Sequence, residues 1–252
     1  ISELNEVIKL KRAIPFKGEI PHRKGRMMSG RYPVNASKLF ISLLKALKGN
    51  SIVNGLDLEK FKIVETQLES RDKLHLDDHE KFVLYAGHLY EWKGADLVAQ
   101  AAKYLTETQV YLVGGTKEDV NNFKKKYPYK NLHIVGFVPH AEIPRWLNAA
   151  DILVLPNSAK EKISSHYTSP MKLFEYMTAK KPILASDLPS LKEVLDTNTA
   201  VFFPADSVVS FVAQIKKMLI DEKMPEIANN AYNKVQEFSW KKRAEKIIEF
   251  IF

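Results

Sequence analysis

Short apolar runs alternate with helical patterns from residue 82 onward, and this alternation constrains the fold more than any other feature. The apolar runs cover 82–87, 109–115, 132–137, 151–156, 182–186 and 200–204. They have the composition of strands buried on both faces of a sheet. Helical patterns lie between them, at 93–104, 117–127, 141–149, 170–179 and 190–196. Because such alternation implies parallel strands with right-handed crossovers, we expect an α/β fold with a doubly wound, Rossmann-like parallel sheet of about six strands.

The two ends of the chain differ from this pattern. After Asp206 the sequence shows helical patterns only, at 206–221, 224–236 and 239–252. Residues 62–81 form a polar linker with a short helix, so we place a domain boundary near Phe61. The chain then divides into a basic N-terminal segment, residues 1–61, and an α/β domain with extra C-terminal helices, residues 62–252.

The net charge is concentrated at the start of the chain. Residues 1–50 hold 11 Lys or Arg and 3 Asp or Glu, whereas the chain as a whole has a net charge of +8. The remainder is therefore neutral. A basic leader on a neutral body fits nucleic acid, an anionic membrane surface or a phosphorylated acceptor, and it equally fits a solvated segment without a partner.

Composition excludes several classes of site. The chain has no cysteine, which rules out disulfides, thiolate nucleophiles and cysteine metal sites. No apolar run approaches the roughly 18 residues that span a bilayer. We expect a cytoplasmic protein, with peripheral contact at the inner face of the membrane left open.

Ligands of such sheets bind beyond the carboxyl ends of the strands, and the helix that precedes the fifth strand is suited to an anion. Ser169 is a good N-cap and Pro170 suits the first helical position. Free backbone N–H groups at a helix start attract phosphate. Lys172 and Glu175 share one helix face, where the lysine suits a phosphate and the carboxylate suits a ribose diol. A solvated ion pair on an amphipathic helix is the alternative.

Several segments in order resemble one enzyme family. They include LYAGHLYEWKGADL at 84–97, GFVPHAEIPRWLNAADILVLPN at 136–157, SPMKLFEYM at 169–177 and KPILASDLPSLKEV at 181–194. From about Asn54 to Phe252 the chain resembles the C-terminal, donor-binding domain of retaining glycosyltransferases with the GT-B fold, of the family 4 or group 1 type. Six matches in the family's order support the resemblance, although none is specific alone.

The resemblance implies a site for a nucleotide-diphospho-sugar such as a UDP- or GDP-sugar, with no metal. By analogy Glu175 bonds the ribose, Lys93 neutralises the diphosphate, and His88 stands where the family has an arginine. The resemblance places the base near Gly136 and Phe137. Further cleft residues by position are Gly87, Tyr167, Ser169, Pro170, Met171 and Lys172.

Three departures from the family bear on activity. His88, unlike arginine, is only partly charged at neutral pH. Tyr167 falls on the first glutamate of the family's E-x7-E element and brings no charge. About 50 residues are too few for the N-terminal acceptor domain, so we interpret 37–48 and 19–23 as remnants of that domain.

The favoured hypothesis is therefore a hexosyltransferase in which this chain supplies the donor-binding half and the acceptor is a glycan or a lipid-linked molecule. An N-terminal domain could come from a partner chain, and a homodimer is a further option. The alternative is a non-catalytic α/β module whose basic leader docks on nucleic acid or an anionic membrane, with nucleic acid the less favoured partner because aromatic residues are sparse in the leader.

Overall fold

The computed structural model describes residues 67–167 and 171–239, together with the single positions 242, 245 and 248. The predicted N-terminal segment and the boundary near Phe61 lie outside these residues. Within the predicted last helix, 239–252, Lys242, Glu245 and Ile248 are helical. The other positions from 240 onward lie outside the described part.

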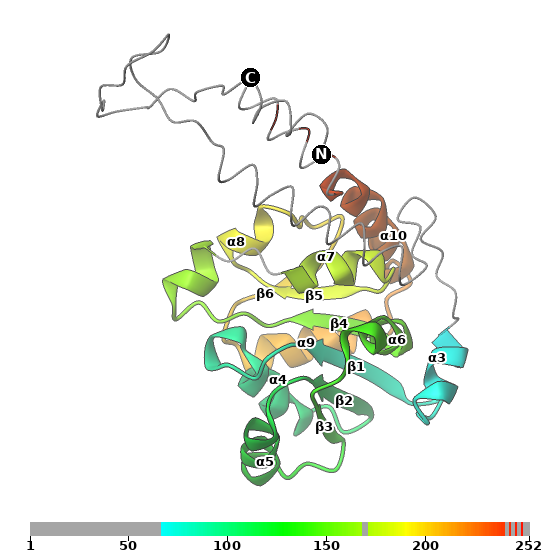
Figure 1. Cartoon of the computed structure of the whole chain (residues 1–252), viewed down its shortest axis with the longest axis vertical. Coiled ribbons are helices and arrows are strands. Elements are labelled where there is room, and N and C mark those ends of the chain that lie inside the picture. The colour runs from blue at the N-terminus through cyan, green and yellow to red at the C-terminus, as the bar shows by residue number, and fades with distance from the viewer. Residues whose placement is uncertain (1–66, 168–170, 240–241, 243–244, 246–247, 249–252) are drawn as a thin grey trace, which may run out of the picture. The chain divides into compact units, whose positions relative to one another are not determined.

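Six parallel strands form one sheet in the order β3-β2-β1-β4-β5-β6 (Figure 1). Their bounds are β1 Lys81–Ala86, β2 Thr108–Val113, β3 Leu132–Gly136, β4 Ile152–Leu155, β5 Ile183–Ser186 and β6 Val201–Phe203. Each lies within a predicted run or begins one residue before it. The expected doubly wound, Rossmann-like α/β fold is confirmed.

Helices connect the strands at nearly the predicted places. The α-helices are α3 Gln67–Lys73, α4 Ala95–Ala102, α5 Lys117–Lys126, α6 Ile143–Ala149, α7 Met171–Thr178, α8 Pro189–Lys192, α9 Val208–Met218 and α10 Met224–Val235. Short 3-10 turns occupy η1 Glu91–Lys93, η2 His140–Glu142 and η4 Gln236–Phe238. The long loop after β4 contains a π-helix, η3 Ile163–Tyr167, which the sequence did not predict.

Both faces of the sheet are buried, as the apolar runs require. Val83 and Tyr85 of β1 belong to a core that includes residues of α4, α5 and α9. Phe82 and Leu84 belong to a second core that includes residues of α6, α7, α8 and α10. Successive strand residues therefore enter opposite layers, which is why the strands are apolar on both sides.

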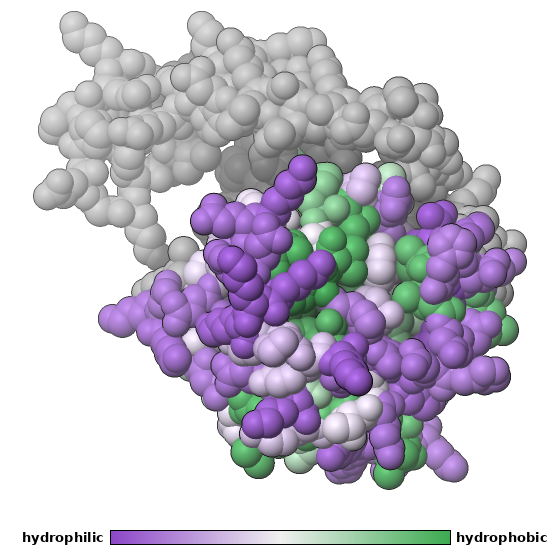
Figure 2. All heavy atoms as spheres, turned by 90° about the horizontal axis from the view of Figure 1, so that it is seen from below, coloured by the Kyte–Doolittle hydropathy of each residue, from purple (hydrophilic) through white to green (hydrophobic). Residues whose placement is uncertain are grey.

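The outer surface of the described part is that of a folded domain with scattered apolar groups. On the face drawn in Figure 2, hydrophilic side chains predominate and apolar ones show as smaller areas between them. No helix among the described residues combines the length and the apolar character needed to cross a bilayer.

Candidate functional site

The strand order reverses between β1 and β4, and this switch point is where open α/β sheets bind ligands. Glycines shape the loop edge on the β1 side. Gly87 donates its N–H to the carbonyl of Val113 at 2.8 Å. Gly114 has φ of +120°, and a Cβ there would lie 2.2 Å from the Gly87 carbonyl oxygen. Only glycine allows the ends of β1 and β2 to approach this closely.

Tyr176 fixes helix α7 against the end of β1. Its side chain is fully buried, and its hydroxyl accepts the N–H of Ala86 at 2.8 Å. Leu173 and Met177 are buried on the same side of the helix. The opposite face of α7, which carries Lys172 and Glu175, is thereby held beside the loop that follows β1.

The Lys172 side chain extends from α7 toward Gly87 and the Tyr85 ring. Its Nζ lies 4.2 Å from the centroid of the Tyr85 ring and 3.6 Å from where a Gly87 Cβ would stand. The residue as a whole is half-buried, but the Nζ atom itself is shielded from solvent and has no hydrogen-bond partner among the described residues. Burial, and secondarily the charge of Lys93, lowers the pKa of Lys172 to about 7, while Glu175 acts in the opposite sense.

Lys93 and His88 lie on an aromatic cluster in the loop after β1, formed with Tyr90 and Trp92. The His88 ring stacks on Tyr90 with centroids 5.1 Å apart. Lys93 Nζ lies 5.3 Å from the Tyr90 centroid and 5.1 Å from that of Trp92. Partial burial lowers the pKa of Lys93. The aromatic faces stabilise its cation without occupying its hydrogen-bond donors.

Glu175 stands one turn after Lys172 on α7. Its Oε1 lies 3.6 Å from Nε2 of the exposed His140 in η2, and about a third of the Glu175 side chain is exposed. The structure thus brings the predicted glutamate and both predicted lysines into one electrostatic group, because Lys93 and Glu175 both act on Lys172. Their roles in binding stay predictions.

The remaining predicted residues are placed as follows. Phe137 follows β3 with 81% of its surface exposed, an unusual position for a phenylalanine and open to a flat partner. Gly136 is buried with φ of +85°, and Met171 is exposed. Tyr167 ends η3. Ser169 and Pro170 lie outside the described residues.

Sequence reasoning missed two buried polar groups at the same edge. Asn157, two residues past β4, and Ser186, at the end of β5, each have a buried side-chain oxygen without a hydrogen-bond partner among the described residues. A buried polar atom without a partner is costly. The signal in the sequence was a polar residue directly after an apolar strand, which many loops also show.

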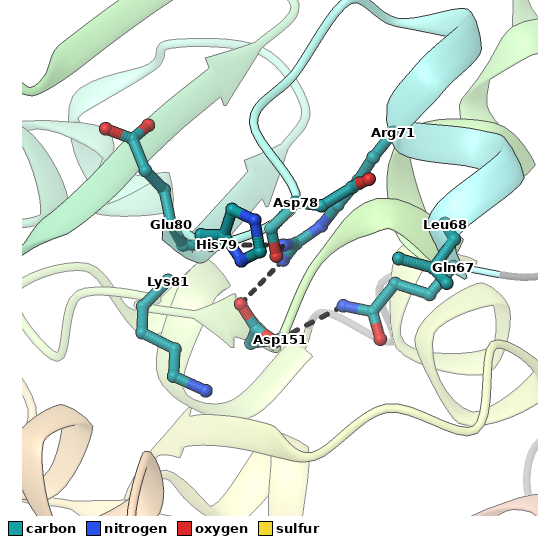
Figure 3. A pocket seen from close by; sticks show the side chains of 8 residues that line it. All are labelled: Gln67, Leu68, Arg71, Asp78, His79, Glu80, Lys81 and Asp151. Carbon is teal, nitrogen blue, oxygen red and sulfur yellow. Dashed lines mark hydrogen bonds and ion pairs between the residues drawn. The ribbon is translucent and has the colours of Figure 1, made fainter.

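A hollow of about 150 Å³ lies at the opposite edge, at the amino ends of β1 and β4 (Figure 3). Here the buried Arg71 donates to Asp151 Oδ2 at 2.8 Å and to the carbonyls of Ala149 and Asp78. Gln67 also donates to Asp151. These hydrogen bonds join α3 to the start of β4. We call them the Arg71 clamp and assign the residues around the hollow a structural role rather than ligand binding.

A comparison with protein families decides the class of the chain. The model of a family described as glycosyl transferases group 1 matches residues 66–235. The chain belongs to this glycosyltransferase family. The matched region contains the whole sheet and every predicted site residue.

One curated relative of the group 1 glycosyltransferase domain and one solved structure illustrate the match. The putative teichuronic acid biosynthesis glycosyltransferase TuaH of Bacillus subtilis is 25% identical over 175 residues, which are 68% of this chain and 43% of TuaH. Among solved structures, Anabaena HepE in complex with UDP-glucose gives a TM-score of 0.62 at 20% identity, covering 73% of this chain and 51% of HepE. The similarity to HepE supports the fold alone.

Another curated protein is similar to a smaller part of this chain. The large ribosomal subunit protein uL22 of Archaeoglobus fulgidus is 39% identical over 71 residues, which are 26% of this chain and 46% of uL22. The chain thus spans less than half the length of each of these curated relatives.

Proposed function

We propose that residues 62–252 are the donor-binding half of a glycosyltransferase that transfers a hexose from a nucleotide-diphospho-sugar. One observation carries the proposal: a shielded lysine Nζ, with no hydrogen-bond partner among the described residues, lies at the switch point with a second lysine and a glutamate around it. Two cations at a glycine-shaped strand end suit a diphosphate. The family membership of the chain supports the same assignment.

The roles follow from the chemistry of each group. Lys93 and Lys172 neutralise the diphosphate, which gains negative charge as the sugar departs. Glu175 accepts hydrogen bonds from the ribose hydroxyls, and Phe137 with Gly136 receives the base. His88 takes the place of the family arginine. Tyr167, Ser169, Pro170 and Met171 line the cleft, and we propose that no metal takes part.

The donor and the outcome of the reaction are proposed by analogy. A UDP-sugar is the first donor to test, because the HepE neighbour is described in complex with UDP-glucose. A GDP-sugar comes next. We propose retention of the anomeric configuration, an acceptor that is a glycan or lipid-linked molecule at the cytoplasmic side of a membrane, and acceptor binding completed by an N-terminal domain of a partner chain or of a second copy.

Calorimetric titration of the chain with UDP, GDP and ADP tests this function. At least one nucleotide should bind, and Glu175→Ala should weaken it by about 1–3 kcal/mol, or roughly 5- to 150-fold, because ribose hydrogen bonds to a charged group are lost. The exposed Glu226 on α10 provides a matched control, and Glu226→Ala should bind as the parent does. Absence of heat with all three nucleotides, or equal affinity in both variants, would contradict the proposal.

The uL22 similarity favours a second candidate function for the N-terminal segment. It covers about a quarter of the chain, and the family match from residue 66 leaves 1–65 as the one continuous stretch of that length outside it. We infer that the uL22-like stretch lies there. This segment also carries the excess basic charge, so ribosomal RNA is its proposed partner, in competition with the interpretation of residues 1–61 as an acceptor-domain remnant.

Salt dependence of RNA binding distinguishes these two interpretations. The full chain should bind RNA of the large ribosomal subunit with an affinity that falls steeply with salt. Replacing Arg23, Lys24 and Arg26 by glutamine should lower the slope of log affinity against log salt by about 2, since three cations are removed. Equal slopes for the parent and the triple variant would exclude the RNA-binding candidate.

A further inference from the structure

The ammonium group of Lys172 has an unusual position for a lysine in a folded domain. Its Nζ is shielded from solvent and has no hydrogen-bond acceptor within the described ranges. The adjacent Tyr85 hydroxyl donates to the His88 carbonyl at 2.6 Å, and no hydrogen bond joins it to Lys172 Nζ. The ring face of Tyr85, 4.2 Å away, is the polarisable surface that meets the ammonium. A cation in this position lacks the hydration that it has in water.

The charged groups around Lys172 do not offset that loss. Lys93, in η1, repels its charge, and Glu175, on α7, attracts it more weakly than burial opposes it. Glu175 is itself beside His140 of η2. Tyr85 and Tyr176 are buried phenols whose pKa values are raised by burial, so they remain neutral, and the His88 ring lies over Tyr90.

A bound diphosphate would change this balance. It would place negative charge beside both lysines, which favours the ammonium form of each. Without such a ligand, burial lowers the pKa of Lys172 to about 7. A group whose charged form is stabilised by a ligand takes up a proton as that ligand binds.

We propose that Lys172 binds a proton together with the diphosphate of the donor, so that above pH 7 a mainly neutral amine becomes an ammonium ion as the donor binds. The proton comes from solvent, and no covalent bond to the donor forms or breaks. This inference rests on the proposed function. It adds that donor affinity depends on pH through one residue of α7.

The direction of the pH dependence follows from linkage. Below pH 7 the amine is already protonated, so affinity should be nearly constant there with respect to Lys172. Above pH 7 each binding event must take up a proton, so affinity should fall by up to about tenfold per pH unit. The opposite trend, or a constant affinity between pH 7 and 9, would overturn the proposal.

Calorimetry in two buffers measures the number of protons taken up on binding. UDP-glucose is the probe because its diphosphate has no group that titrates near neutrality. A group of pKa about 7 should take up about 0.9 proton per donor bound at pH 8.0. Titrations in Tris and in HEPES should therefore differ in heat by about 0.9 times the difference between the ionisation enthalpies of the two buffers.

Three variants assign the proton to one side chain. Lys172→Met should remove the uptake and weaken binding at pH 7, and Lys172→Arg, which stays charged, should remove the uptake alone. Lys217→Met, the same change at an exposed lysine of α9, should behave as the parent. Uptake that persists in Lys172→Met would overturn the inference.

The outcomes of this experiment separate the two proposals. Binding of UDP-glucose without proton uptake contradicts the role of Lys172 and leaves the donor site in place. Failure to bind UDP-glucose, GDP-mannose and ADP-glucose alike contradicts the proposed function and this inference with it. If Lys172→Met does not fold by circular dichroism, the pH dependence of the parent chain still decides.

Discussion

At the scale of single residues, the chain keeps a lysine where folding alone would favour an apolar side chain. Lys172 Nζ has no hydrogen-bond partner in the described part, and burial holds its pKa near 7. The unfolded chain, with a lysine pKa of 10.5, binds the proton more tightly. Between pH 7 and pH 10.5 the unfolded state therefore holds more protons, and the free energy of unfolding should rise with pH.

Urea denaturation at pH 7 and pH 9 measures this cost. The parent chain should gain roughly 2 kcal/mol more than Lys172→Met over that interval, since each unit of pKa difference is worth about 1.4 kcal/mol. Lys181, whose pKa burial lowers to about 8, contributes to both proteins alike. Lys217→Met should follow the parent. An equal gain in Lys172→Met would show that this lysine keeps its proton in the fold.

At the scale of elements, the loop after β1 and the end of β4 pack through a glycine. Gly94 has φ of +75°, and a Cβ there would lie 1.8 Å from the carbonyl oxygen of Pro156. Pro156 directly follows β4. Gly94 therefore allows the segment bearing Lys93 to lie against the second strand of the switch point.

Gly94→Ala compared with Gly136→Ala tests this contact. Both glycines have positive φ, but the new Cβ at Gly136 would meet only a Val120 methyl at 3.1 Å. The strain of positive φ is common to both variants, about 1–3 kcal/mol, so their difference reports the backbone clash. Gly94→Ala should be the less stable of the two by about 1–3 kcal/mol in chemical denaturation. Equal stabilities would mean that the two segments can separate at little cost.

Local sequence was informative about elements and much less so about their contacts. Strands such as 151–156 could be located because burial on both faces leaves a continuous apolar run. Helical spacing placed Lys172 and Glu175 on one face of α7. By contrast, the burial of Lys172 Nζ against Tyr85 joins residues 87 positions apart, and the hydrogen bond from the Ser164 hydroxyl of η3 to the Trp92 carbonyl joins residues 72 positions apart. No local pattern records such contacts.

At the scale of the whole molecule, one compact α/β unit, residues 63–244, contains every predicted site residue. The strand order puts the ends of β1 and β4 side by side, so residues 87–93 and the loop after β4 meet there. A sugar donor needs cations for its diphosphate and an acceptor for its ribose, and in the proposed site α7 together with the β1 loop would provide both. The Arg71 clamp at the other edge is saturated by protein groups.

The most direct test of this account is a crystal structure of the chain with bound UDP, or with whichever of UDP, GDP and ADP binds in solution. The account predicts the diphosphate beyond the carboxyl ends of β1 and β4, within hydrogen-bond distance of Lys172 Nζ, and the ribose hydroxyls on the Glu175 carboxylate. A nucleotide bound at any other place, such as the hollow beside Arg71, would contradict it.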